Sequence, residues 1–148
     1  MKNHFYLRAF LAGAFIPTLA LPLMLCVFVV ARLVLRVALP IERAIIFPMA
    51  LVPLLWALWN MLWVASHPRT HLAIGLHGAI LPFLLLPSGA LVATCLGVLH
   101  LSEQGATWFH ACTVPYALIA PVFLCVLAGY YLVWKYVVGF LNRELEIG

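Results

Sequence analysis

The chain has 148 residues, of which 67% are hydrophobic and 8% are charged, and its formal net charge at pH 7 is +4. Soluble domains carry roughly 25% charged residues, so this composition excludes an ordinary soluble fold and predicts an integral membrane protein. The basic residues form no dense run, which argues against nucleic-acid binding, and the length fits one domain covering residues 1–148.

Four apolar segments are long enough to cross a bilayer, which takes about 20 residues in a helix. They lie at residues 9–31, 44–65, 72–99 and 114–134. Their connections are short, and the apolar runs are continuous. The sequence therefore predicts an all-α integral membrane protein, a single bundle of four transmembrane helices.

Basic residues predict the orientation of these helices, because Lys and Arg are enriched in cytoplasmic segments. The side holding both termini and the second loop carries five of them: Lys2, Arg8, Arg69, Lys135 and Arg143. The other side carries three, Arg32, Arg36 and Arg43, whose long side chains can reach lipid headgroups. We expect both termini in the cytoplasm and a bacterial-type inner membrane, with these three arginines binding lipid phosphate.

An internal repeat is visible in the first and third segments. LAGAFIPTLALP at residues 11–22 and LHGAILPFLLLP at residues 76–87 are identical at seven of twelve positions. The alternative is chance similarity, because membrane helices are built from few residue types. Duplication would make residues 7–66 and 72–136 two similar helical hairpins in tandem, related by a pseudo-twofold axis along the membrane normal.

Each copy of the repeat holds a glycine four residues before a proline, Gly13 with Pro17 and Gly78 with Pro82. Proline cannot bond the carbonyl four residues back, so each pair predicts a kink and a freed carbonyl that needs a partner. The functional interpretation is that the two kinks line a pathway. The alternative is that they improve packing between helices.

Three histidines gather near one membrane face in SHPRTHLAIGLH: His67, His71 and His77. Imidazole is a common ligand of haem iron and of other transition metals, so these residues are candidates for a b-type haem or metal site. Interfacial histidines bonded to water or backbone are the alternative, and we expect no cofactor in that case.

One face of the second segment is aromatic. Trp56, Trp59, Asn60 and Trp63 follow i, i+3, i+4 and i+7 spacing, which places them together on a helix. Such a face suits a flat apolar ligand such as a quinone, or a contact with a partner helix in which Asn60 is hydrogen-bonded. We expect it to point into protein and not into lipid.

The sequence contains no recognisable catalytic motif, and no acidic residue lies within an apolar run, which argues against a carboxylate proton relay. No catalytic residue is predicted, and an enzyme is not the expected function. We expect a structural or interaction subunit of a membrane assembly, in contact with the bilayer and either a homo-oligomer or bound to other membrane subunits. An oligomeric channel or permease for a neutral or apolar solute, and a haem- or quinone-binding redox subunit, are the alternatives.

Overall fold

The computed structural model of the chain describes residues 4–36, 47–109 and 112–147. Helices α1 (Phe5–Leu33), α2 (Phe47–Thr70) and α3 (Ile74–Cys95) come first in the chain. The last helix is continuous and comprises α4 (Tyr116–Leu132), the π-helical segment η2 (Val133–Val138) and α5 (Gly139–Glu144). Three short strands separate α3 from α4: β1 (Leu99–Ser102), β2 (Gly105–Trp108) and β3 (Cys112–Val114).

Three helices in the described part of the chain are long and apolar enough to cross a membrane. They cover Phe5–Leu33, Ile74–Cys95 and Tyr116–Glu144. The predicted span at residues 44–65 overlaps α2 but lies partly outside the described residues, so the fourth crossing stays a prediction. The structure thus supports a helical membrane protein with three candidate spans.

Two helices end elsewhere than the apolar pattern predicts. The pattern predicts that the third span reaches residue 99, but α3 stops at Cys95, because Gly97 adopts a left-handed φ of 67° that turns the chain toward β1. It predicts that the fourth span ends at residue 134, but this helix continues to Glu144. Trp134, Val138 and Asn142, spaced four apart, are all buried, so packing carries this helix beyond its apolar run.

Strands β1, β2 and β3 form a small antiparallel sheet, where the apolar pattern predicts a helix end and a loop. The strand order is β1-β2-β3, with Leu99 opposite Trp108 and Ala106 opposite Val114. The prediction of an all-α chain is therefore incomplete here. The available signal is the strict alternation of Leu-His-Leu-Ser, which is typical of a strand with one apolar face.

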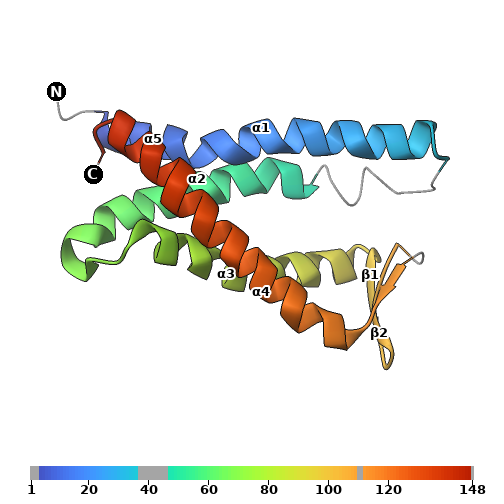
Figure 1. Cartoon of the computed structure of the whole chain (residues 1–148). Coiled ribbons are helices and arrows are strands. Elements are labelled where there is room, and N and C mark those ends of the chain that lie inside the picture. The colour runs from blue at the N-terminus through green and yellow to red at the C-terminus, as the bar shows by residue number, and fades with distance from the viewer. Residues whose placement is uncertain (1–3, 37–46, 110–111, 148) are drawn as a thin grey trace.

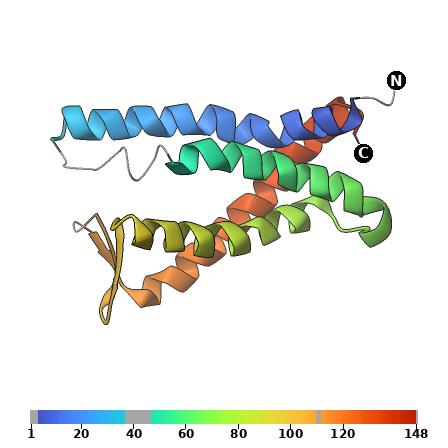
Figure 2. The ribbon, with the colours of Figure 1, turned by 180° about the vertical axis from the view of Figure 1, so that it is seen from behind.

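Figures 1 and 2 show how the helices are arranged. Helices α1 and α2 lie side by side, whereas the last helix crosses α3 and reaches the start of α1, so both described chain ends lie together. The sheet lies at the opposite end of the molecule, where the helices spread apart. The two hairpins are therefore unlike, because α1 and α2 lie side by side whereas α3 and the last helix cross. The predicted tandem repeat is not confirmed.

The core is concentrated toward the end that holds the termini. One buried cluster contains Ala9, Ala12, Trp63, Val64 and Ile147, and a second contains Trp56, Leu81, Trp134 and Val138. Helix α4 has no buried residue at all between Tyr116 and Leu132. The described contacts that hold the fold together are therefore gathered in one half of the bundle.

Candidate functional site: a buried amide and aromatic junction

A pair of asparagines joins three helices at the buried end. Asn60 of α2, which is 0% exposed, donates from Nδ2 to the Ala9 carbonyl of α1 at 2.8 Å and to Asn142 Oδ1 at 2.9 Å. Asn142 of α5 donates back to Asn60 Oδ1 at 3.0 Å. Burying an amide without partners is costly, so the reciprocal bonds are what allow two amides in this apolar core. The pair fixes the register of α5 against α1 and α2.

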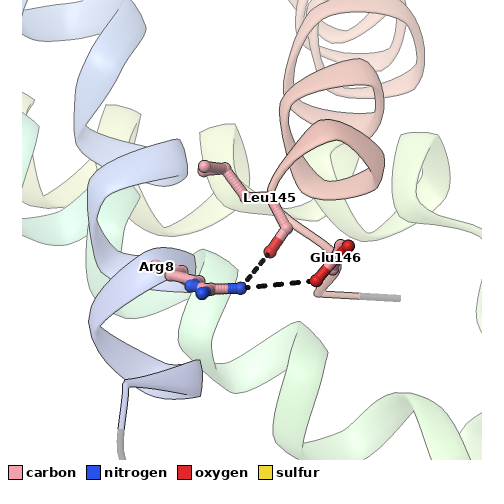
Figure 3. Close-up of polar contacts among 3 residues, drawn as sticks. All are labelled: Arg8, Leu145 and Glu146. Atoms are coloured by element: carbon pink, nitrogen blue, oxygen red, sulfur yellow. Dashed lines mark hydrogen bonds and ion pairs between the residues drawn. The ribbon is translucent and has the colours of Figure 1, made fainter. Parts of the chain in front are cut away.

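The C-terminal segment is also held to α1 at the surface, as Figure 3 shows. The Arg8 guanidinium donates to the Leu145 carbonyl at 3.2 Å and lies 3.8 Å from the Glu146 carboxylate. Because these two charged side chains are 42% and 84% exposed, the ion pair contributes little stability by itself. Burial of the apolar Ile147 side chain beside Ala9 stabilises this contact more, and it anchors the last described residues to the bundle.

Trp59 and His77 form a second reciprocal pair, between α2 and α3. The Trp59 indole N–H donates to the His77 carbonyl at 2.9 Å, and His77 Nε2 lies 3.0 Å from the Trp59 carbonyl. Since a carbonyl only accepts, Nε2 carries the proton and donates. The two rings also stack, with centroids 4.7 Å apart and planes 25° apart. In this arrangement Nε2 is engaged in a hydrogen bond and is not offered to a haem iron or a metal.

The other two candidate histidines belong to different surroundings. His67 packs on Trp63 with ring centroids 4.6 Å apart, and the His71 ring is 6.4 Å from that of His67. His77 instead is buried beside Trp134, at 6.0 Å. Across residues 4–36, 47–109 and 112–147, no three or more His, Cys, Asp or Glu side chains are grouped so as to hold a metal ion.

The glycines of the repeated phrase lie where helices touch most closely. A Cβ on Gly13 would fall 2.7 Å from the Trp56 carbonyl oxygen and 2.8 Å from Ala57 Cα, so α1 packs here against the backbone of α2. A Cβ on Gly78 would overlap the base of the Trp134 indole, so α3 packs here against η2. Pro17 and Pro82 are buried beside these contacts. Each glycine thus provides space for a neighbouring helix.

Trp134, the last residue of the predicted fourth span, is a central residue of this junction. It is 0% exposed and packs on Gly78, on His77 and on Trp56, whose ring centroid lies 5.6 Å away. Sequence reasoning misses both Trp134 and Asn142 as core residues. Their spacing of four from Val138 is the available signal, but the charged residues Lys135 and Arg143 beside them indicate a solvent-facing end.

The tryptophan face of α2 points into the protein, as its spacing predicts. Trp56, Asn60 and Trp63 are buried, and Trp59 is half-buried. Their contacts are with helices of the same chain, and the Trp63 indole N–H donates to the Leu72 carbonyl at 3.0 Å.

The predicted headgroup-binding arginines follow the first span at the opposite end. Arg32 lies in the last turn of α1, and Arg36 is exposed just beyond it. Arg43 lies outside the described residues. The structure therefore places two of the three arginines at the end of α1 that is distant from the buried junction.

Beside the junction, α2 and α3 line an open groove of about 430 Å³. Its lining residues are Leu55, Leu58, Trp59 and Leu62 from α2 and Leu81, Leu84, Leu85 and Ser88 from α3. The single hydroxyl, that of Ser88, donates within its own helix to the Leu84 carbonyl at 2.6 Å. The groove is therefore an apolar surface whose one side-chain hydroxyl is already satisfied.

Together these contacts describe a site built for packing. The side-chain polar groups of Asn60, Asn142, Trp59, Trp63 and His77 are bonded to one another or to backbone carbonyls of neighbouring segments. The indole N–H groups of Trp56 and Trp134 are buried among these contacts with no hydrogen-bond partner in the described part of the chain, and the α2–α3 groove is apolar. Comparison with protein-family models, with curated proteins and with solved structures found no match to this chain.

Proposed function

We propose that the chain is a small structural subunit of a membrane assembly, and that the α2–α3 groove receives an apolar transmembrane helix of a neighbouring subunit. The observation that carries this proposal is the groove itself, which is leucine-lined and has no free side-chain hydroxyl. Helices recognise such grooves through side chains at i, i+3, i+4 and i+7 spacing.

The lining supports a helical occupant in particular. Leu55, Leu58 and Leu62 follow i, i+3, i+7 spacing on α2, and Leu81, Leu84, Leu85 and Ser88 follow i, i+3, i+4, i+7 on α3. The groove thus runs along two ridged helix surfaces. In a membrane, helices associate mainly through van der Waals packing of such surfaces, because lipid is as apolar as leucine. Leu81, 2% exposed, forms the floor and joins the groove to the buried junction.

The role predicted for Trp56, Trp59, Asn60 and Trp63 changes under this proposal. They pack inside the chain, and Trp59, whose indole N–H bonds the His77 carbonyl, is the one of the four that lines the groove. The partner therefore contacts leucines that the sequence does not single out. The proposal keeps three earlier expectations: a homo-oligomer or other membrane subunits as partners, a tandem relation of the two hairpins, and cytoplasmic termini. Both described chain ends lie at the same end of the molecule, which agrees with termini on one side of the membrane.

The channel or permease alternative needs a different arrangement. Gly13 and Gly78 face close helix contacts within one chain, so a solute path past Pro17 and Pro82 would have to form between copies. A pathway lined by Pro17 and Pro82 predicts solute flux through reconstituted homo-oligomers, whereas a structural subunit predicts no solute flux.

Photo-cross-linking in cells tests the proposal. We would place benzoylphenylalanine at Leu58 or Leu84 in the groove and, as matched controls, at Leu19 of α1 or Leu124 of α4, which are 55% and 64% exposed outside it. The expected result is a discrete protein adduct from both groove positions and lipid adducts from both controls. Co-expression of a second, differently tagged copy shows whether the adduct is the chain itself or another subunit.

Lipid adducts from all four positions would overturn the proposal, because the groove would then face the bilayer. The same protein adduct at equal yield from groove and control positions would also overturn it, since contact would not be specific to the groove.

A further inference from the structure

The register of the small sheet sorts its side chains by polarity. Because cross-strand neighbours share a face and successive residues alternate, the pairing defines two sets. One face carries Leu99, Leu101, Ala106, Trp108, Cys112 and Val114. The other carries His100, Ser102, Thr107 and Thr113. Three strands that are separate in the sequence thus build one amphipathic surface.

The apolar face is only partly covered by the protein. Leu99 and Ala106 are buried at 3% and 6% exposure, whereas Leu101 is 66% exposed and Trp108 is 37% exposed. On the polar face, the Thr107 and Thr113 hydroxyls bond each other at 2.9 Å. The sheet therefore presents a leucine and a tryptophan on one side and an exposed hydroxyl pair on the other.

The position of the sheet is determined by its neighbours in the chain. It connects α3, which ends at Cys95, to α4, which begins at Tyr116, and both belong to helices long and apolar enough to cross a membrane. The Tyr116 hydroxyl donates to the Ser102 carbonyl at 2.8 Å and ties the β1–β2 hairpin to the start of α4. In Figures 1 and 2 the strands run across the axis of α3, and the hairpin extends past the end of α4. Where two such helices cross a bilayer, the sheet that joins them lies at its boundary.

We propose that β1–β3 is an interfacial anchor that rests on the lipid surface, with Leu101 and Trp108 inserted between headgroups and acyl chains and the polar face in water. Tryptophan is enriched at this depth, because its ring is apolar and its N–H can bond a headgroup. Between residues 99 and 114, Glu103 is the one side chain of the Asp, Glu, Lys and Arg types. The anchor therefore binds through apolar insertion and does not require anionic lipid.

Spin-label accessibility in phosphatidylcholine vesicles tests the anchor. Labels at Leu101→Cys and His100→Cys compare adjacent residues of β1 on opposite faces, in a chain whose four cysteines, all exposed, are replaced by serine. The label at residue 101 is expected to relax several-fold more with oxygen, which concentrates in lipid, than with an aqueous nickel chelate. The label at residue 100 is expected to show the reverse preference.

A second comparison protects the test against a misfolded variant. It keeps the natural Cys112 as the single cysteine, with Thr113→Cys as its partner in a Cys112→Ser background, so the first of the two retains the native sheet sequence. Cys112 is expected to prefer oxygen and residue 113 the nickel chelate. Equal preference on the two faces would overturn the proposal, because the sheet would then project into water. Shielding of residues 101 and 112 from both reagents would also overturn it, since protein would cover that face.

Discussion

Alanine at position 78 is expected to lower the free energy of unfolding by about 1–3 kcal/mol, the usual cost of forcing extra atoms into a packed core. The new methyl group would overlap Trp134 at Cβ, Cγ and Cδ1, which are the rigid base of that side chain and not a flexible end. Trp134 is fully buried against Trp56 and His77, so it cannot move aside without disturbing both. Separation of α3 from η2 is the expected structural result.

Gly13→Ala is expected to act in the same way at the contact of α1 with α2. Its methyl group would meet the Trp56 carbonyl oxygen at 2.7 Å and Ala57 Cα at 2.8 Å, and backbone atoms have no alternative rotamer to adopt. Gly13 and Gly78 do not have a positive φ, so the substitution tests space and not backbone conformation.

Two other helical glycines are matched controls, one in α3, the helix that holds Gly78, and one in α4. Gly89 in α3 and Gly129 in α4 have no atom within 4 Å of a built Cβ. Alanine there is expected to leave stability unchanged or to raise it slightly, because alanine is the better helix former. Unfolding in mixed detergent, followed by tryptophan fluorescence, measures all four variants, since Trp56 and Trp134 report on the core. Equal stability at positions 13, 78, 89 and 129 would contradict the role assigned to the two glycines.

Asn142→Leu is expected to destabilise the protein by roughly 1–3 kcal/mol, the cost of leaving a buried polar group without its partner. The substitution removes the donor to Asn60 Oδ1 and the acceptor of one of the two bonds from Asn60 Nδ2, and the bond from Asn60 to the Ala9 carbonyl remains. The C-terminal segment, including Ile147, is expected to loosen from α1 and α2 as a result.

A double-mutant cycle separates the amide pair from other effects of the substitution. Asn60→Leu, Asn142→Leu and the double variant are expected to give a coupling energy of roughly 0.6–1.7 kcal/mol, the range between the mean and the maximum measured for hydrogen bonds between membrane helices. The same fluorescence-detected unfolding provides the values. Additive losses would show that the two amides do not stabilise each other, and that α5 is held by Ile147 and its apolar neighbours alone.

Local pattern in the sequence determined several features of this protein. The scarcity of charge predicted a membrane chain, and long apolar runs predicted the helices of the described residues, three of which are long and apolar enough to cross a membrane. The i, i+3, i+4, i+7 spacing of Trp56, Asn60 and Trp63 correctly predicted a face turned into protein. The last of these features depends on residues within about two turns of one helix, so the side-chain periodicity of the α-helix is enough to predict it.

The partners of that face were decided by the tertiary structure alone. Asn60 bonds Asn142, 82 residues away, and the spacing of four from Val138 does not by itself distinguish Asn142 from a polar residue at a frayed helix end. The local pattern around Gly78 predicts only a proline kink, because the indole that fills the space beside it, that of Trp134, comes from a distant helix of the chain.

The sheet shows the same division. The alternation in residues 99–102 is local and is visible in the sequence, but the amphipathic surface appears only when β1, β2 and β3 pair in one register. Register depends on hydrogen bonds between strands and on the turn at residues 103–104, and a slip of one residue would move every side chain to the other face. Periodicity within one element can be predicted from the sequence, whereas contacts between elements depend on which surfaces meet in space.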